Sequence, residues 1–268
     1  MKNKVVIITG ATSGIGKALA EKFAAEGAQV VIAGRDAVRL SEEEKKISAS
    51  GAVVLAVQCD VSDEQQCKSL IEKTVSRFGG IDVLINNAGI SMRAVFNDTD
   101  LSVLKKLMDI NFWGTVYCTK YALPYLLKSK GSVVGVSSIA GKKGLPGRTG
   151  YSASKFAMEG FLETLRTENL KTGLHVLIAC PGFTASNIRN SALSKDGLAQ
   201  GESPRTETKM MQPEEVAAHI YKAIKTRKRD LILTGNGKLT VLLNKFFPSL
   251  MDKMVYNHMA KEPDSPFK

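Results

Sequence analysis

Short runs of apolar residues, rich in Val and Ile, alternate along the chain with longer segments whose apolar residues recur at helical spacing. Runs that are apolar throughout are typical of strands buried on both faces, and the longer amphipathic segments are typical of the helices that cover them. Strands are expected at residues 5–9, 30–33, 53–57, 83–85, 133–137, 176–179 and 231–233. Helices are expected at residues 15–25, 40–47, from an Asp63 cap to about residue 78, and at 101–127, 151–172 and 213–225, with Pro124 bending or ending the fourth.

This alternation predicts an α/β fold, a doubly wound parallel sheet of seven strands with helices on both faces. No linker-like stretch divides the chain, so we expect one domain, residues 1–234, followed by an amphipathic extension at 235–268 that packs on the same domain or on a partner. Ligands of such sheets bind at the carboxyl ends of the strands. The least regular segment, residues 187–212, is a long loop of the kind that is often functional.

The composition is that of a globular protein, since 44% of the 268 residues are hydrophobic and 24% are charged. No apolar run reaches the ~18 residues of a membrane-spanning helix, and the first strand begins at Val5, so we expect a cytoplasmic protein without a signal peptide. The four cysteines form no CxxC pair and the three histidines are scattered, so we expect buried reduced thiols and no metal site. The net charge of +11 suits phosphate-bearing ligands, nucleic acid or an anionic membrane, and equally suits solubility alone.

A glycine-rich turn follows the first expected strand directly and opens the first expected helix. It reads Thr9-Gly10-Ala11-Thr12-Ser13-Gly14-Ile15-Gly16. Glycines permit a tight turn and let a pyrophosphate approach the backbone, while the helix N-terminus presents free N–H groups to it. The spacing departs from the common GxGxxG fingerprint, so the turn by itself indicates either a nucleotide site or an ordinary strand–helix connection.

The residues at the end of the second strand indicate which nucleotide would bind. NAD-preferring sites usually place a carboxylate there to hold the ribose hydroxyls. Gly34 occupies this position and Arg35 follows, which favours the 2′-phosphate of NADP(H), with Thr12 or Ser13 as a further donor. Asp36 counts against this preference. NAD(H) therefore stays an alternative, as does a solvated Arg35 without a ligand.

Tyr151 and Lys155 are four residues apart in an expected helix and share one of its faces. A neighbouring ammonium favours phenolate, so we expect Lys155 to lower the pKa of Tyr151 and to make it a proton donor and acceptor near neutral pH. The spacing alone usually marks a surface contact. Further chemistry-bearing residues follow the expected strands at the same edge of the sheet, namely Asn86-Asn87-Ala88-Gly89, Ser138 and Pro181-Gly182. Together these features predict an active site at that edge.

In order and spacing, these motifs resemble those of the short-chain dehydrogenase/reductase family. The resemblance rests on TGATSGIG at 9–16, NNAG at 86–89, Asn111, Ser138, YSASK at 151–155 and PG at 181–182, and it covers Val5 to about Leu233. It implies a Rossmann-type fold, an NAD(P) cofactor and hydride transfer between this cofactor and a carbonyl or alcohol. It also implies a homodimer or homotetramer.

The resemblance implies a role for each matching residue. Tyr151 would be the general acid for carbonyl reduction, and Lys155 would lower its pKa and hydrogen-bond the nicotinamide ribose. Ser138 would hold the substrate oxygen, and Asn111 would position a water that links Lys155 to solvent. Asp60 and Val61 would contact the adenine. The full set of cofactor contacts would be Gly10, Thr12, Ser13, Gly14, Ile15, Gly16, Arg35, Asp60, Val61, Asn87, Ala88, Gly89, Tyr151, Lys155, Pro181, Gly182 and Thr184.

The chain departs from the family pattern after the PG pair. The family usually has PGxIxT, whereas this chain has Thr184 and Ser186 at the last two defined positions, so either hydroxyl could reach the nicotinamide carboxamide. Residues 187–212 would form a mobile lid over the substrate. The basic residues of this lid either attract an anionic substrate or are simply solvated; they are Arg189, Lys195, Arg205 and Lys209.

The tail beyond residue 234 is similar to the tails of family members that reduce lipid or steroid ketones, without their N-terminal anchor. It mixes apolar and basic residues, so it would serve as an apolar lid, as a peripheral contact with anionic membrane, or as packing against the chain's own core or a partner subunit.

We therefore expect an NADPH-dependent reductase of a ketone, with a hydrophobic, lipid-like or steroid-like substrate. An NAD(P)-dependent sugar or polyol dehydrogenase is the alternative among enzymes. A non-catalytic dinucleotide sensor is the alternative of another class, although such a protein would have lost the Tyr, Lys and Ser set that is intact here. No recognition helix or aromatic RNA-binding signature accompanies the basic charge, so we expect no nucleic-acid partner.

Overall fold

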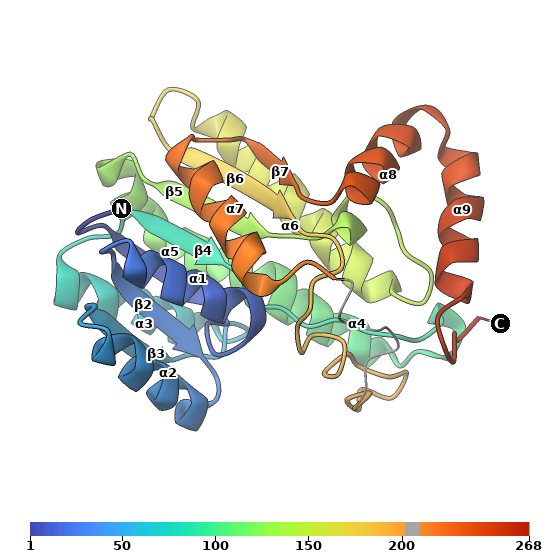
Figure 1. The fold of residues 1–268 in the computed structure, drawn as a ribbon, viewed down its shortest axis with the longest axis horizontal. Coiled ribbons are helices and arrows are strands. Elements are labelled where there is room, and N and C mark those ends of the chain that lie inside the picture. Colours follow the sequence, from blue (N-terminus) through green and yellow to red (C-terminus); the bar gives the residue numbers. More distant parts are fainter. Residues whose placement is uncertain (202–209, 268) are drawn as a thin grey trace.

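The computed structural model describes residues 1–201 and 210–267. Seven parallel strands form one sheet in the order β3-β2-β1-β4-β5-β6-β7 (Figure 1), which confirms the doubly wound α/β fold. Within the described ranges the strands are β1 (Val5–Thr9), β2 (Gln29–Gly34), β3 (Val54–Gln58), β4 (Val83–Asn86), β5 (Ser132–Val136), β6 (His175–Cys180) and β7 (Asp230–Ile232). The α-helices are α1 (Gly14–Ala25), α2 (Ala37–Ala49), α3 (Glu64–Phe78), α4 (Leu101–Leu107), α5 (Gly114–Ser129), α6 (Thr149–Glu168), α7 (Pro213–Lys225), α8 (Gly235–Phe246) and α9 (Pro248–Ala260).

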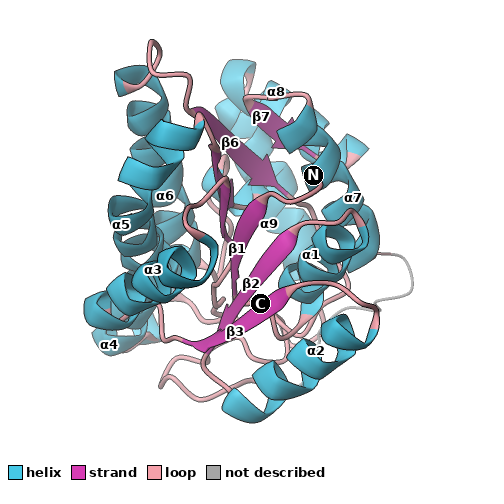
Figure 2. Ribbon diagram, turned by 90° about the vertical axis from the view of Figure 1, so that its left-hand side faces the viewer, coloured by secondary structure: helices cyan, strands magenta, loops and turns pink. Residues whose placement is uncertain are grey.

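The central strands are buried along their whole length, as the apolar runs predict. Every residue of β1, β4, β5 and β6 is buried, because helices cover both faces of the sheet. Figure 2 shows α1, α2 and α7 on one face and α3, α5 and α6 on the other. On the first face the rings of Phe23 and Tyr221 meet edge to face at 5.3 Å and join α1 to α7.

The predicted helix cap at Asp63 is confirmed. Its carboxylate accepts hydrogen bonds from the backbone N–H of Gln65 at 2.9 Å and of Gln66 at 3.1 Å. The helix ends at Gly79, which adopts a left-handed φ of 78° that favours glycine.

The prediction of a single helix at residues 101–127 is wrong. A π-helical turn, Met108–Trp113, separates α4 from α5. Pro124 neither ends nor interrupts α5, which continues to Ser129. Pro124 lies on the exposed side of the helix, so water can satisfy the carbonyl that loses its N–H partner there.

Two boundaries near the site also differ from the expectation. The helix expected at 151–172 is α6, which starts at Thr149 and ends at Glu168. The Asn169 side chain donates to the carbonyl of Leu165 at 2.8 Å and thereby ends the helix. Strand β5 ends at Val136, one residue earlier than expected, and Ser138 lies in the turn after it.

The segment after β7 folds into α8 and α9, which lie beyond the carboxyl ends of the strands (Figure 1). In residues 1–201 and 210–267, no helix combines the length and apolar character needed to cross a bilayer. All four cysteines are free and buried, as expected. The sequence, the sheet order and the helix layers therefore place every C-terminal strand end at one edge, where the site is found.

Candidate active site

One cavity of about 1590 Å³ runs along the carboxyl ends of the strands. Most residues singled out in the sequence line it, namely Gly10, Thr12, Ser13, Gly14, Ile15, Arg35, Asp60, Val61, Asn87, Ala88, Gly89, Ser138, Tyr151, Lys155, Pro181, Gly182 and Thr184. Two others, Gly16 and Asn111, are buried behind this surface. The candidate residues therefore converge on one cavity although they are spread over the chain.

The glycine turn has a shape that only glycines permit. Gly10 and Gly14 adopt left-handed φ angles of 64° and 51°. A Cβ atom on Gly16 would lie 2.1 Å from the carbonyl oxygen of Gly10 and 2.4 Å from Nδ2 of Asn87. Among the described residues the side chain of Ser13 makes no capping hydrogen bond to α1, and Gly14 and Ile15 at the start of this helix line the cavity. A close-fitting cradle at a helix N-terminus fits the pyrophosphate of a dinucleotide.

Asn87 supports this turn rather than only lining the cavity. Its Nδ2 donates to the carbonyls of Thr9 at 2.9 Å and Gly10 at 3.1 Å. In return, the Thr9 hydroxyl accepts from the backbone N–H of Asn87 at 3.1 Å and of Ala88 at 3.0 Å. The end of β4 thus holds the end of β1 in position.

One face of α6 contacts the turn after β5 at successive helical turns. Tyr151 lies beside the hydroxyl of Ser138, and Lys155 Nζ donates to the carbonyl of Val136 at 2.9 Å. Lys155 Nζ lies 5.9 Å from the centroid of the Tyr151 ring. The predicted sharing of one helix face is therefore confirmed, and the face points at the strand end.

Burial dominates the electrostatics of this pair. It raises the pKa of Tyr151, against the opposing effects of the Ser138 hydrogen bond and the Arg148 charge. Burial also lowers the pKa of Lys155 to about 8. The expected net lowering of the Tyr151 pKa is thus not found, because desolvation of the phenolate is the larger effect. The low pKa of Lys155 nevertheless lets it exchange a proton near neutral pH.

Asn111 sits in the π-helical turn and is fully buried. Its amide side chain accepts from the N–H of Ile90 at 2.8 Å and donates to the carbonyl of Ile90 at 3.0 Å and to the hydroxyl of Ser154 at 2.9 Å. A Cβ on Gly89 would lie 3.1 Å from Asn111 Oδ1 and 3.5 Å from Lys155 Nζ. The amide therefore holds the backbone after Gly89 close to Lys155.

At the end of β2, a residue without a side chain, Gly34, is followed by the positively charged Arg35. A Cβ on Gly34 would lie 2.9 Å from Cγ2 of Thr12, so a carboxylate-bearing residue does not fit there without a shift. The carboxylate of Asp36 caps α2 by accepting from Val38 and Arg39 N–H groups, and it pairs with the Arg39 side chain at 3.4 Å. Asp36 is thus engaged by the cap and by Arg39, and Arg35, Asp36 and Arg39 all line the cavity.

The segment after the PG pair is held by its own backbone contacts. Thr184 is buried, and its hydroxyl donates to the carbonyl of Gly182 at 3.2 Å. Ser186 approaches the glycine turn, with its Cβ 3.1 Å from the position of a Cβ on Gly14. Arg189 is buried and donates to the carbonyl of Thr184 at 2.8 Å, which counts against a role in attracting an anionic substrate.

The described part of the expected lid forms one wall of the cavity. Leu193 is buried and forms two backbone hydrogen bonds with the segment that follows β4, one with Ser91 and one with Arg93. Lys195 is exposed and does not line the cavity. The other two basic residues of the lid, Arg205 and Lys209, lie outside the described residues.

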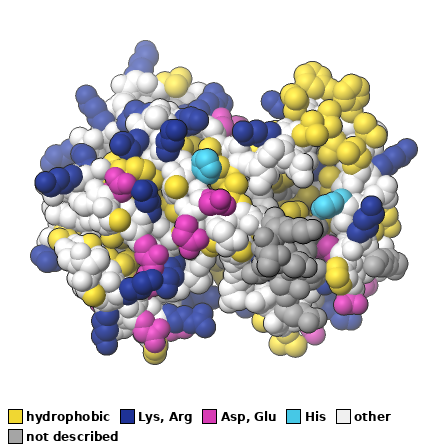
Figure 3. Space-filling view, viewed as in Figure 1, with side chains coloured by type: hydrophobic (Ala, Val, Ile, Leu, Met, Phe, Trp, Pro, Cys, Tyr) yellow, Lys and Arg dark blue, Asp and Glu magenta, His cyan; other side chains and the backbone are white. Residues whose placement is uncertain are grey.

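The tail helices supply the opposite, apolar wall. Its cavity-lining apolar residues are Leu239, Met251, Met254, Val255 and Met259. Helix α8 packs closely on the turn after Ser138, since a Cβ on Gly237 would lie 2.7 Å from Cδ1 of Ile139. On the outside, apolar side chains gather over α8 and α9, at the upper right of Figure 3.

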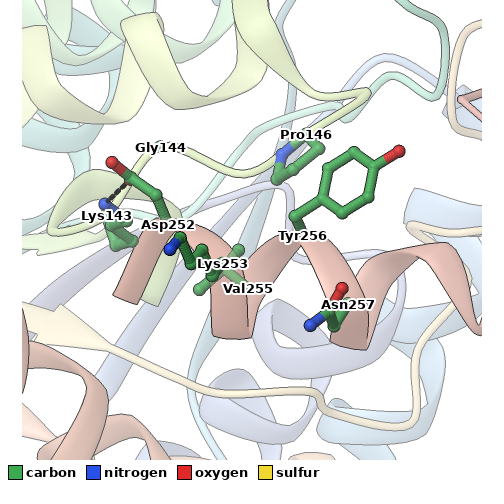
Figure 4. Close-up of a pocket in the computed structure, with 8 residues that line it drawn as sticks. All are labelled: Lys143, Gly144, Pro146, Asp252, Lys253, Val255, Tyr256 and Asn257. Atoms are coloured by element: carbon green, nitrogen blue, oxygen red, sulfur yellow. Dashed lines mark hydrogen bonds and ion pairs between the residues drawn. The ribbon is translucent and has the colours of Figure 1, made fainter. Parts of the chain in front are cut away.

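Ion pairs at both ends of α9 fasten the tail to the domain. Glu262 is buried after α9, and its carboxylate pairs with Arg148 at 3.1 Å and Arg93 at 3.6 Å. On the outer side, a shallow hollow separates α9 from residues 143–146, and the ion pair between Lys143 and Asp252 lies at its edge (Figure 4). The tail therefore packs on the same chain.

Sequence reasoning missed several of these residues. Arg39 follows Arg35 at i+4, a spacing that could have marked it as a second cationic neighbour. Arg148 gave no signal, because its partner Glu262 is remote in the sequence. The tail residues were recognised as amphipathic, but their pattern does not say which side faces a cavity.

Comparisons with known proteins agree with this geometry. The chain matches the short chain dehydrogenase family model over residues 4–197. It is 36% identical over 270 residues to "Dehydrogenase/reductase SDR family member 7B" of Danio rerio, an alignment that covers 98% of this chain and 87% of the relative. It is 41% identical over 188 residues to "11-beta-hydroxysteroid dehydrogenase-like 2" of Arabidopsis thaliana, covering 69% of this chain and 60% of the relative.

Solved structures show the same arrangement of elements. A short-chain dehydrogenase/reductase from Burkholderia phymatum in complex with NAD has a TM-score of 0.84 and 26% identity, covering 93% of this chain and 95% of that one. An alcohol dehydrogenase from the archaeon Thermococcus sibiricus, complexed with 5-hydroxy-NADP, has a TM-score of 0.77 at 23% identity and covers 87% and 96% of the two chains, which shows the fold alone. The chain is an NAD(P)-dependent oxidoreductase that belongs to the short-chain dehydrogenase/reductase family.

Proposed function

We propose that this protein is an NADPH-dependent reductase that converts an extended apolar ketone to the alcohol. One observation carries the proposal: Tyr151, Lys155 and Ser138 lie in a single cavity between the glycine cradle and the apolar wall of the tail. The cradle suits the cofactor, and the apolar wall suits the substrate. The polar residues between the two are those that a carbonyl reduction needs.

The chemistry divides between the cofactor and the chain. When bound, NADPH supplies the hydride that adds to the carbonyl carbon. Ser138 holds the carbonyl oxygen, and Tyr151 gives that oxygen its phenolic proton, so that an alcohol and oxidised cofactor result. The raised pKa of Tyr151 keeps the phenol protonated before the transfer.

Lys155 assists the proton transfer from Tyr151. Its ammonium lies close enough to stabilise the tyrosinate that forms, and its hydrogen bond to Val136 fixes its direction. The same ammonium would hold the nicotinamide ribose. Asn111 would position a water that restores the proton of Lys155 from solvent, which its place behind Gly89 supports.

The preference for NADPH rests on charge at the end of β2. Arg35 and Arg39 would face the 2′-phosphate, and Thr12 or Ser13 would add a donor. Asp36 also lines the cavity, but its carboxylate accepts from backbone N–H groups of α2 and pairs with Arg39. Neutral Gly34 adds no further negative charge beside the arginines.

The remaining cofactor contacts follow the length of the cavity. Asp60 and Val61 at the end of β3 would border the adenine. The backbone at residues 87–89 would pass beside the middle of the cofactor, and residues 181–184 would border the nicotinamide. Thr184 and Ser186 both stay candidates for its carboxamide, because both line the cavity.

The substrate class follows from the tail wall. Met, Leu and Val side chains form an adaptable apolar surface, and the Arabidopsis relative is named for a hydroxysteroid dehydrogenase. We therefore favour a steroid-like or long-chain lipid ketone over a small polar sugar. Exposed Lys238, Lys245 and Lys253 accompany the apolar surface of α8 and α9, which supports a peripheral contact with anionic lipid as the source of such a substrate.

The homo-oligomer that the family implies finds support on a different surface. Trp113 stacks on Tyr117 with ring centroids 5.6 Å apart, and 42% of Trp113 is exposed. Phe156 on α6 is exposed as well. Aromatic side chains of this kind are enriched at subunit interfaces, so sedimentation of wild type against Trp113→Lys tests the assembly.

The decisive experiment follows NADPH oxidation with matched panels of 3-keto lipids, keto steroids and keto sugars. We expect turnover with apolar ketones and its loss in Tyr151→Phe, which keeps the ring but has no proton to give. Phe161→Leu, remote from the cavity, serves as a folded control. Faster turnover of sugars would favour the polyol dehydrogenase, and unchanged turnover in Tyr151→Phe would refute the role of this tyrosine.

A further inference from the structure

Glu159 is a buried carboxylate to which the proposed reaction assigns no role. It lies one helical turn after Lys155 on α6, and only 5% of its surface is exposed. A buried charge is costly unless it is paired and hydrogen-bonded. The partners of Glu159 are therefore informative about why the chain keeps it there.

These partners come from the segments that border the nicotinamide end of the cavity. Glu159 Oε1 accepts from the hydroxyl of Ser137 at 2.6 Å and from the thiol of Cys180 at 3.4 Å. Glu159 Oε2 pairs with Lys142 Nζ at 2.6 Å. Ser137 directly precedes Ser138, and Cys180 directly precedes Pro181. One carboxylate thus joins α6 to the turn that holds the substrate oxygen and to the end of β6.

The backbone closes tightly over this carboxylate. A Cβ on Gly141 would lie 2.3 Å from Glu159 Oε1 and 2.6 Å from the hydroxyl of Ser137. Gly141 ends the 3₁₀ turn that starts just after Ser138. Only a glycine lets that turn rest on the carboxylate, so the position of Ser138 depends on the contacts of Glu159.

The three residues Tyr151, Lys155 and Glu159 follow one another at intervals of four and share a face of α6. Their partners are Ser138, Val136 and Ser137, which are consecutive at the end of β5. The first two contacts belong to the proposed chemistry. The third extends the same helix–turn contact by one more turn.

We propose that Glu159 is a positioning residue of the reaction, which holds the Ser137–Ser138 turn against α6 and whose negative charge acts on Lys155 one helical turn away. This inference rests on the proposed function, because it acts through Ser138 and Lys155. Glu159 does not line the cavity and touches neither the substrate nor the cofactor site.

Within the part of the chain that the structure describes, few other groups contribute to the electrostatic part of the proposal. The charged and titratable groups around Lys155 there are Tyr151 and Glu159 on α6, Arg148 before it, Lys142 after the 3₁₀ turn, Cys180 on β6 and the exposed Lys106 on α4. Burial lowers the pKa of Lys155, and the charge of Glu159 opposes this. Lys142 partly offsets Glu159, because the two form an ion pair.

This arrangement predicts opposite effects for the two partners. Glu159→Gln keeps the shape and an acceptor for Ser137 but removes the charge, so the ammonium of Lys155 is disfavoured. Lys142→Met removes the charge that offsets Glu159, so the ammonium is favoured. Ketone reduction falls as Lys155 loses its proton. The basic limb of the kcat profile should therefore move about half a pH unit toward acid in Glu159→Gln and toward base in Lys142→Met.

A second readout avoids turnover altogether. In the cofactor-free protein, the Cε resonance of Lys155, assigned by its loss in Lys155→Met, should titrate at lower pH in Glu159→Gln and at higher pH in Lys142→Met. Ser137→Ala should lower kcat through Ser138 with a smaller shift of either profile. Glu43→Gln is the matched control, because Glu43 is a buried carboxylate that pairs with Lys17 at 2.9 Å away from the cavity.

The inference is overturned if both profiles superimpose on wild type, or move in the same direction, while Tyr151→Phe abolishes turnover. If Tyr151→Phe stays active, the proposed function fails instead, and the resonance titration still decides whether Glu159 acts on Lys155. Should Glu159→Gln not fold, the direction of the Lys142→Met shift decides alone.

Discussion

Arg148 and Glu262 form a buried ion pair at 3.1 Å although the chain between them includes more than a third of the protein. Arg148 immediately precedes α6, and its charge acts on Tyr151. Glu262 follows α9 and also pairs with Arg93. The end of the tail is thereby held at the start of the helix that carries Tyr151, so the proposed proton donor and the proposed substrate wall depend on the same ion pair.

Glu262→Gln should loosen the tail. It removes the carboxylate that pairs with two largely buried arginine side chains, and breaking a buried pair costs about 3–5 kcal/mol when one partner is lost. The tail can relieve this cost by detaching, which removes the apolar wall from the cavity. We expect KM for apolar ketones to rise about tenfold or more, while KM for NADPH changes little, together with faster proteolysis beyond α8.

Asp252→Asn is the matched control for that variant. It removes the other ion pair of the tail, with Lys143, but the side chain of Asp252 is 69% exposed. Exposed pairs contribute about 0–1 kcal/mol, so steady-state constants and proteolysis should resemble wild type. Equal effects of the two substitutions would contradict the special role of Glu262.

Gly16→Ala should abolish tight cofactor binding. Its Cβ would lie 2.1 Å from a backbone oxygen of Gly10, so the glycine turn has to shift. Overpacking of this kind costs about 1–3 kcal/mol, which corresponds to a rise of about 5- to 150-fold in the Kd of NADPH measured by calorimetry. Gly160→Ala is a matched helical glycine with open space around it and should leave that Kd unchanged.

Arg35→Asp should shift the cofactor preference toward NADH. It replaces one of the two cations at the end of β2 with a carboxylate, and hydrogen bonds to charged groups contribute about 1.5–3 kcal/mol each. We expect the ratio of kcat/KM for NADPH over NADH to fall at least about tenfold, and further in Arg35→Asp with Arg39→Ala. Lys222→Asp, an exposed change of the same charge on α7, controls for net charge. An unchanged ratio would show that Arg35 is not a phosphate ligand.

The sequence allowed the sheet to be predicted because its strands are apolar on both faces, a pattern that few other elements share. The same reasoning placed Gly10, Ser138 and Tyr151 in one site, since parallel strands end at one edge. Each motif alone was weak evidence for a site. Their positions directly after strands that end at one edge of the sheet were strong evidence. The local sequence pattern was therefore enough to predict those parts of the site that the strand order brings together.

Features that depend on contacts remote in sequence could not be predicted. The π-helical turn that carries Asn111 interrupts a continuous apolar period, because the amide of Asn111 binds the backbone of Ile90 on another segment. The raised pKa of Tyr151 follows from how deeply the fold buries it, whereas spacing shows only that Lys155 is near. The partner of Arg148 lies in a tail whose pattern does not identify its inner face.

The buried ammonium of Lys155 should lower the free energy of unfolding of the protein. Its pKa is about 8 in the folded state, against an ordinary value of 10.5 in the unfolded chain. Below pH 8 both states are protonated, and the native state bears the full cost of the buried ammonium, about 3 kcal/mol. Between pH 8 and 10.5 the unfolded state binds more protons, so wild-type stability rises with pH over this interval.

Lys155→Met removes that cost together with the hydrogen bond to Val136, whose loss offsets about 1 kcal/mol. We expect the variant to be inactive and about 2 kcal/mol more stable than wild type at pH 7 in urea unfolding, with the difference disappearing toward pH 10. Lys105→Met, at an exposed position on α4, should show no such trend. A gain that is constant with pH would mean that packing of the methionine, rather than relief of a buried charge, is responsible.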